Sequence, residues 1–196
     1  MNADHTADGI NESAREFANQ LDKDILGNFQ GKQVIICGPG CNDGCTANDG
    51  VSCHAEECWL ERRRLWQRAL IQDLFVAPIV LEDIFTKQQL TIQHEVEFCR
   101  KKSDAILLFL GTLGVSEEFN KFRFDQELIK KMITFVPAKY MTYYSPETSW
   151  GPYADSLNEY QVKQRGLLYA YDENNMVNTY ETIKRVLKGF FTHQGS

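Results

Sequence analysis

The chain has 196 residues, of which 43% are apolar and 24% are charged, and its formal net charge is −6. This length is sufficient for one substantial core, and the composition is that of an ordinary globular domain. The negative charge argues against a general nucleic-acid surface, because phosphate binding needs clustered positive charge. The short basic run Arg62-Arg63-Arg64 lies in a helical pattern and is interpreted as a solvated helix face.

No apolar stretch approaches the roughly 20 residues of a transmembrane helix. The N-terminal residues MNADHTADG are polar and lack the basic region and apolar core of a signal peptide. We therefore expect a cytoplasmic protein without a membrane partner. Disulfide bonds are not expected in that compartment, so the six cysteines need another explanation.

The first part of the chain is predicted to contain one helix and one strand before a cysteine-rich insertion. Residues 1–9 and 193–196 are expected to be tails of one domain, residues 10–192, and 1–9 to be disordered. Apolar residues recur at helical spacing from Ile10 to Ile25, which predicts an N-terminal helix that stops at Gly27. The buried strand 33–37 follows, and residues 41–58 form the insertion, in which two Asn-Asp-Gly tripeptides favour tight turns.

The rest of the chain alternates between helical and strand patterns. Helices are predicted over about 56–74, 88–102, 115–131 and 175–191, and strands over 76–80, 104–110, 133–136 and 167–171, with an irregular stretch at 140–162. Pro78 favours an edge position for the strand 76–80. The alternation predicts an α/β fold of the flavodoxin or Rossmann-like kind, a three-layer sandwich around a five-stranded, mainly parallel sheet.

Ligands of open parallel sheets bind where the strands end, so the residues that follow each strand are candidates for a site. After the first strand, Gly38-Pro39-Gly40 lets the backbone approach a phosphate or a sugar oxygen, and a simple tight turn is an equal alternative. After the second strand, Glu82 and Asp83 can accept hydrogen bonds from sugar hydroxyls. The alternative for Asp83 is that it caps the next helix.

The third strand leads into two adjacent carboxylates, Glu117 and Glu118. We expect Gly111 and Gly114 to bracket the turn, Ser116 to cap the helix, and both carboxylates to lie in its first turn. Successive helical residues point about 100° apart, so only one of the two faces the crevice. Such a carboxylate could attack an anomeric carbon or stabilise an oxocarbenium ion. The alternative is that both glutamates only complement the helix dipole.

Five of the six cysteines fall within residues 37–58. Four of them provide enough thiolates for a tetrahedral structural zinc ion, while a disulfide, an iron–sulfur cluster or free thiols remain alternatives. Cys37 beside the glycine turn could be a nucleophile, but no histidine is paired with it, and Cys99 is expected in the core. The candidate zinc ligands are Cys41, Cys45, Cys53 and Cys58.

The ordered motifs of the chain resemble the nucleoside 2-deoxyribosyltransferase-like superfamily over residues 33–186. The likeness is greatest to the deoxyribosyltransferase-like effector proteins of bacterial retron defence systems, which also have a counterpart of Trp150-Gly151-Pro152. The motifs are C-G-P-G at 37–40, R-x-x-L-W-x-x-x-L at 62–70, L-E-D-I-F at 81–85, S-D-A-I-L-L-F at 103–109 and G-x-x-x-E-x-x-x-F at 114–122.

The resemblance implies cleavage of an N-glycosidic bond, with Gly38 and Pro39 in the turn that holds the sugar. Gly114 and Phe122 match residues that flank the catalytic glutamate, which selects Glu118 and leaves Glu117 as its outward neighbour. Asp104 matches the aspartate that opens the third strand and is a second catalytic candidate, unless its role is only structural. The chain departs from the family at Phe119, where a small residue is common.

Together these features predict an enzyme that cleaves a nucleoside, a nucleotide or NAD by hydrolysis or deoxyribosyl transfer, in antiviral defence or as a toxin-like effector. Aromatic residues such as Trp66, Tyr143 or Tyr144 could stack on the base. The alternative is a non-catalytic nucleotide sensor with a metal- or redox-responsive cysteine cluster, and a third possibility is a zinc-stabilised scaffold. The resemblance also allows a homo-oligomer, and nucleic acid is not an expected partner.

Overall fold

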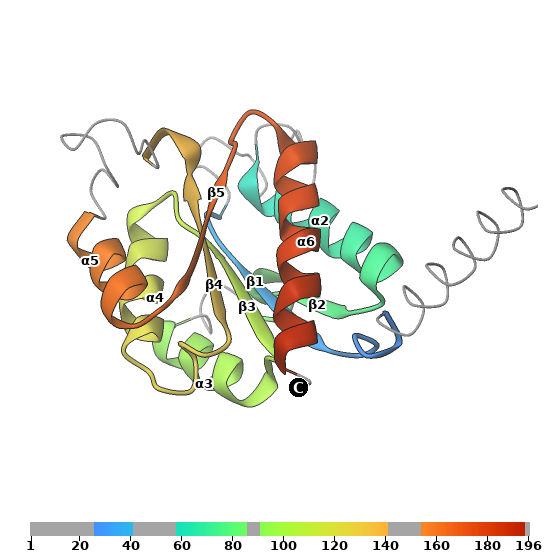
Figure 1. Cartoon of the computed structure of the whole chain (residues 1–196), viewed down its shortest axis with the longest axis horizontal. Coiled ribbons are helices and arrows are strands. Elements are labelled where there is room, and N and C mark those ends of the chain that lie inside the picture. Colours follow the sequence, from blue (N-terminus) through green and yellow to red (C-terminus); the bar gives the residue numbers. More distant parts are fainter. Residues whose placement is uncertain (1–25, 41–57, 86–90, 141–153, 195–196) are drawn as a thin grey trace, which may run out of the picture.

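The computed structural model describes residues 26–40, 58–85, 91–140 and 154–194 of the chain. In these residues a five-stranded, all-parallel sheet lies between two layers of helices (Figure 1). The strand order is β2-β1-β3-β4-β5, which is the predicted flavodoxin-like arrangement. The strands are β1 (Gln33–Cys37), β2 (Ala77–Val80), β3 (Ala105–Phe109), β4 (Met132–Pro137) and β5 (Leu167–Tyr171).

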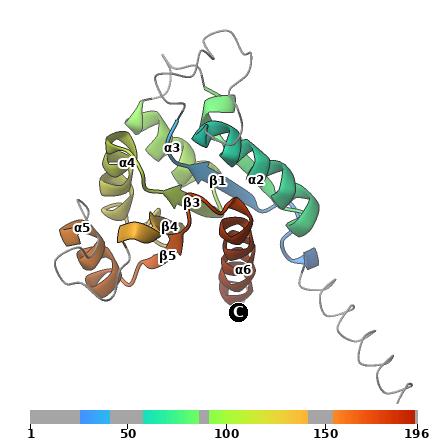
Figure 2. The ribbon, with the colours of Figure 1, turned by 90° about the horizontal axis from the view of Figure 1, so that it is seen from above.

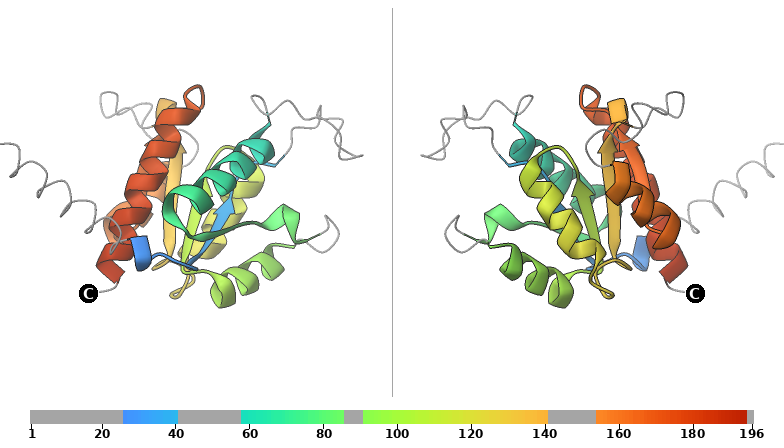
Figure 3. Two further views of the ribbon diagram at one scale, coloured as in Figure 1. Left: turned by 90° about the vertical axis from the view of Figure 1, so that its right-hand side faces the viewer. Right: turned by 90° about the vertical axis from the view of Figure 1, so that its left-hand side faces the viewer.

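Helices α2 (Trp59–Leu74) and α6 (Met176–Gln194) cover one face of the sheet. Helices α3 (Ile92–Lys102), α4 (Leu113–Arg123) and α5 (Ala154–Asn158) cover the other face (Figures 2 and 3). None of the helices in the described ranges is both long and apolar enough to cross a membrane.

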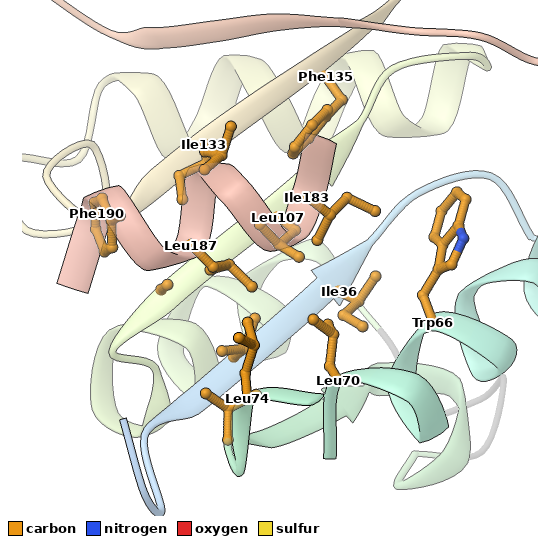
Figure 4. Packing of buried hydrophobic residues seen from close by; sticks show 14 of the residues in the cluster. Ile36, Trp66, Leu70, Leu74, Leu107, Ile133, Phe135, Ile183, Leu187 and Phe190 are labelled. Carbon is orange, nitrogen blue, oxygen red and sulfur yellow. The ribbon is translucent and has the colours of Figure 1, made fainter. Parts of the chain in front are cut away.

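The two faces of the sheet bury different side chains. The face under α2 and α6 is apolar and aromatic, with Trp66 and Leu70 of α2 packed near Ile183 and Leu187 of α6 (Figure 4). The face under α3 and α4 is also apolar, but it includes the thiols of Cys37 and Cys99. The predicted alternation of elements therefore buries a core on each side, as a central parallel sheet requires.

The edge position of β2 agrees with its sequence. Residues of β3 are buried at every position, whereas those of β2 alternate between half-buried and buried. Pro78 cannot donate a ladder hydrogen bond, and among the strands of the described ranges β2 pairs with β1 alone.

Several predicted helix boundaries are wrong. The second helix begins at Trp59 after Cys58, and α3 begins at Ile92, where the Thr91 side chain accepts a hydrogen bond from the backbone N–H of His94 at 3.3 Å. The helix predicted to reach residue 131 ends at Arg123. Just beyond it, the Asp125 carboxylate accepts hydrogen bonds from two following backbone N–H groups, which favours a turn over further helix.

The stretch 140–162 was expected to be irregular, and this is wrong at its end. Residues Ala154–Asn158 are α-helical, and Glu159–Lys163 form a π-helical turn. Tyr160 anchors this turn, since its buried hydroxyl donates to the carbonyl oxygen of Met132 at 3.1 Å. A Cβ atom at Gly166 would lie 2.1 Å from the Tyr160 ring, so the turn requires glycine there.

Other expectations fall outside the described residues. These are the tail 1–9, nearly all of the N-terminal helix, the insertion except Cys58, and the Trp150-Gly151-Pro152 motif. Leu26 and Gly27, at the predicted end of the N-terminal helix, are helical and are followed by a turn.

Candidate functional site

The candidate site lies at the carboxyl ends of β1 and β3, which are adjacent parallel strands. The turns that follow them pack closely: a Cβ atom at Gly111 would lie 2.9 Å from Cγ of Pro39. A Cβ atom at Gly38 would lie 3.2 Å from Cβ of Phe109 and 3.3 Å from Cδ of Arg63. Glycine at 38 and 111 therefore permits close packing at this edge, whereas Gly40 is exposed.

Glu118 points into the protein and Glu117 points to solvent. The Oε2 atom of Glu118 is enclosed and has no hydrogen-bond partner among the described residues. Its neighbour Phe119 is fully buried and packs edge-on against Tyr160, with ring centroids 5.3 Å apart. As the helical step predicts, only one of the two carboxylates is turned inward, and Phe119 occupies the core. The choice of Glu118 as the catalytic residue stays a prediction.

A second carboxyl group, that of Glu95 on α3, lies near Glu118 and is only 7% exposed. Burial raises the pKa of Glu118 to about 8, with a further increase from the charge of Glu95 and a smaller opposing effect of Arg63. Burial also raises the pKa of Glu95 to about 7, helped by the charge of Glu82. Near neutral pH the two carboxyl groups therefore retain a proton between them.

The positive charge that acts on both carboxyl groups comes from Arg63, whose side chain is 1% exposed. Its guanidinium forms a bidentate pair with the Glu82 carboxylate. The same group donates to the carbonyl oxygens of Ile36 at 3.2 Å and Pro39 at 3.1 Å. Arg63 thus joins α2, the end of β1, the glycine turn and the segment after β2.

Two thiols lie beside these carboxyl groups. Cys37 at the end of β1 and Cys99 on α3 are both buried and free of disulfides. Their side chains are hydrogen-bonded to each other. The pKa of the Cys37 thiol is raised well above its usual value. The causes are the hydrogen bond with Cys99, burial, and the nearby charges of Glu118 and Glu95. Because the thiolate is the reactive form, this environment argues against Cys37 as a nucleophile. The prediction that Cys99 belongs to the core is confirmed.

Glu82 and Asp83 lie in a 3-10 turn, Leu81–Asp83, directly after β2. Both oxygens of Glu82 bond to Arg63, and Asp83 pairs with Arg64. The interpretation of Asp83 as a helix cap is wrong, because the cap of α3 is Thr91. Whether either carboxylate contacts a sugar stays a prediction.

The expected geometry at the start of α4 is also corrected. The helix begins at Leu113 after Thr112, so Gly114 lies inside the helix and Ser116 is not its cap. The Ser116 hydroxyl instead donates to the carbonyl oxygen of Thr112 at 3.1 Å. The earlier start places Glu118 beyond the first turn, where a helix dipole has less effect on a carboxylate.

Asp104 lies at the opposite end of the sheet from Glu118. It precedes β3, where its Oδ2 atom accepts a hydrogen bond from the backbone N–H of Gln33 at 2.7 Å. Its other oxygen lies 3.6 Å from Nζ of Lys32. The catalytic interpretation of Asp104 is therefore not supported, because the length of β3 separates it from the carboxyl pair, and its contacts are structural.

Of the four proposed zinc ligands, only Cys58 lies in the described residues. It is fully buried and immediately precedes α2. Within the described ranges no group of three or more metal-binding side chains is assembled. The zinc prediction rests on Cys41, Cys45 and Cys53, which lie outside those ranges, so it stays a prediction.

Arg63 and Glu95 were missed as site residues, although helical periodicity could have found both. Arg63 lies on the same face of α2 as the buried residues Trp66, Leu70 and Leu74, so the solvated-face interpretation is wrong for it. Glu95 lies one turn before the buried Cys99. Trp66 packs on Phe109 at 4.9 Å in the other core and cannot stack on a base at this site. Tyr143 and Tyr144 lie outside the described residues.

The chain was also compared with known proteins. Neither a scan against protein-family models nor a search of curated proteins found a match.

Proposed function

We propose that this protein cleaves the N-glycosidic bond of a nucleoside, a nucleotide or NAD, as an enzyme of the nucleoside 2-deoxyribosyltransferase-like kind. The observation that carries the proposal is the Glu118 carboxyl group at the carboxyl edge of a parallel sheet, whose Oε2 atom is enclosed and has no hydrogen-bond partner in the described residues. A buried carboxylate without a partner costs stability, and such groups gather at functional sites.

The pairing of Glu118 with Glu95 supports this chemistry. Glycosidic cleavage uses one ionised carboxylate to stabilise positive charge at the anomeric carbon and one protonated carboxyl to assist departure of the leaving group. Two buried carboxyl groups that share a proton provide both forms near neutral pH.

In the proposed reaction the C1′–N bond breaks, and the electron pair of that bond leaves with the base. The reactive form is the less populated one, because the pKa of Glu118 is the higher of the two. In that form Glu95 carries the shared proton and donates it to the departing base, and ionised Glu118 bonds to C1′ or stabilises it as an oxocarbenium ion. Water then adds to C1′ in hydrolysis and returns a proton to Glu95, and any bond between Glu118 and C1′ breaks with its electron pair returning to the carboxylate. In transfer, the nitrogen of a second base takes the place of water. The glycine turn Gly38-Pro39-Gly40 would hold the sugar beside Glu118.

The resemblance of the sequence motifs to retron effector proteins supports a role in antiviral defence or toxin-like nucleotide depletion. A cytoplasmic location, a homo-oligomeric assembly and a zinc ion in the cysteine-rich insertion remain parts of this proposal. The location, the assembly and the zinc ion do not follow from the Glu118–Glu95 pair and need tests of their own.

The test is to incubate the protein with a panel of nucleosides, nucleotides and NAD and to measure by chromatography the free base that is released. We expect Glu118→Gln to lower kcat/KM by roughly 10²–10⁴-fold, because the amide cannot become an anion. The matched control is Glu117→Gln, which changes the exposed neighbour on the same helix and should alter kcat/KM by about twofold or less. Equal activity of Glu118→Gln and the wild-type protein would contradict the assignment.

A further inference from the structure

Arg63 and Glu82 are arranged to support the site rather than to touch the reacting atoms. Four of the five N–H groups of Arg63 are used, two by Glu82 and one each by the carbonyl oxygens of Ile36 and Pro39. Its Nε atom is buried without a hydrogen-bond partner in the described part of the chain. A planar guanidinium can hold a carboxylate and two carbonyl groups at once, whereas a lysine ammonium cannot match this fork.

The arginine also lies against the turn that would hold the sugar. The Cδ atom of Arg63 approaches so closely that any Cβ atom at Gly38 would lie 3.3 Å from it. The carbonyl of Pro39 is tied to the same side chain. The position of this turn relative to Glu118 therefore depends on where Glu82 holds the guanidinium.

A second pair on the same helix provides a comparison. Arg64 bonds to Glu61 and Asp83 on the outer side of α2, and its side chain is 33% exposed. Exposed pairs of this kind contribute little and are screened by salt. The pair Arg63–Glu82 differs from it in burial and in its bonds to the end of β1 and to the turn.

We propose that Arg63 and Glu82 are positioning residues, which hold the Gly38–Gly40 turn against Glu118 and set the net charge that Glu118 and Glu95 experience. The proposal rests on the proposed function for its effect on catalysis. Its effect on charge can be measured without a substrate. The charged and titratable groups that face Glu118 are Glu95 from α3, Arg63 from α2, Glu82 from the turn after β2, and Cys37 at the end of β1.

The charge part is tested by Glu82→Gln, which removes a negative charge and leaves the arginine in place. We expect ionisation of Glu118 to move to lower pH, since one like charge nearby is lost. The measurements are the acidic limb of the pH profile of kcat/KM and carbon-13 NMR titration of the Glu118 carboxyl, assigned with Glu118→Gln. The control is Glu61→Gln, which should leave the midpoint unchanged.

The positioning part is tested by the double variant Arg63→Met with Glu82→Met. Replacing a buried ion pair by apolar residues of similar volume is often neutral for stability, so this variant is expected to fold. If Arg63 only stabilised the protein, the folded double variant would keep wild-type kinetics. We expect a higher KM and at least a tenfold lower kcat/KM. The control, Arg64→Met with Glu61→Met, should keep the wild-type values.

The outcomes separate this proposal from the proposed function. If the wild-type protein releases no base, the proposed function fails, and the NMR midpoint in Glu82→Gln still decides the charge part. If Glu82→Gln does not fold, NMR titration of Glu118 in the variant with Arg63→Met and Glu82→Met decides the charge part instead. Loss of the guanidinium, the larger of the two opposing charge effects on Glu118, should then raise the midpoint. Unchanged Glu118 midpoints, or wild-type kinetics in a folded double variant, overturn the proposal.

Discussion

The two ends of the sheet treat a carboxylate in opposite ways. At the amino end, Asp104 is 40% exposed, accepts a backbone hydrogen bond and lies near Lys32. At the carboxyl end, Glu118 is turned inward, and one of its oxygens is enclosed without a partner. The first arrangement joins two neighbouring strands, and the second makes ionisation of the carboxyl group unfavourable. This difference shows why a carboxylate that follows a parallel strand is a better catalytic candidate than one that precedes it.

The largest expected effect on stability comes from breaking the ion pair at the carboxyl end of the sheet, compared with breaking the one at the amino end. Arg63→Ala leaves the Glu82 carboxylate, which is 27% exposed, and the carbonyl oxygens of Ile36 and Pro39 without their donor, so it should lower the free energy of unfolding by about 3–5 kcal/mol. Lys32→Ala breaks an exposed contact of 3.6 Å at the amino end and should cost about 0.5 kcal/mol. Urea denaturation of the two variants measures both values. Similar losses in the two variants would remove the contrast between the ends.

An effect of similar size is expected from pH. The pKa of Glu118 is about 8 in the folded protein and near 4.5 when the chain is unfolded, so the folded state binds more protons between these values. The free energy of unfolding should therefore fall as the pH rises from about 4.5 to about 8. Glu118→Gln removes this loss and should be more stable than the wild type at pH 9, by about 3–5 kcal/mol. Thermal denaturation at pH 5 and pH 9 provides the comparison. A stability difference between variant and wild type that does not change with pH would contradict the burial of this charge.

Among the changes to a carboxylate, the smallest effect is expected at the amino end of the sheet. Asp104→Asn keeps an oxygen that can accept the hydrogen bond from Gln33 but loses the negative charge, so it should cost about 1 kcal/mol. Because Asp104 is half-exposed, the cost should decrease as salt is added. Denaturation at low and high ionic strength measures this. A stabilised Asp104→Asn would place this residue in the same class as Glu118.

The predictable part of the site is the part that depends on local geometry. Strand ends follow from the apolar runs, and the roughly 100° step of a helix leaves room for only one of Glu117 and Glu118 to face inward. Arg63 was within reach of the same reasoning, since it shares a helix face with Trp66. Its charge suggested a solvated position, and only carbonyl and carboxylate partners from three other segments make its burial favourable.

By itself, the amino-acid sequence determined the order of strands and helices, the parallel sheet, and the expectation that only one of Glu117 and Glu118 faces inward. These follow from hydrophobic periodicity and helical geometry, which act over a few residues at a time. The choice of Glu118 between the two rested on the family resemblance. Only the tertiary structure decided which distant side chains share one environment. It places Glu95 and Glu118 together, pairs Arg63 with Glu82 under the glycine turn, and separates Asp104 from them by the length of a strand. The physical reason is that burial and charge coupling depend on distance in space, which no local pattern encodes.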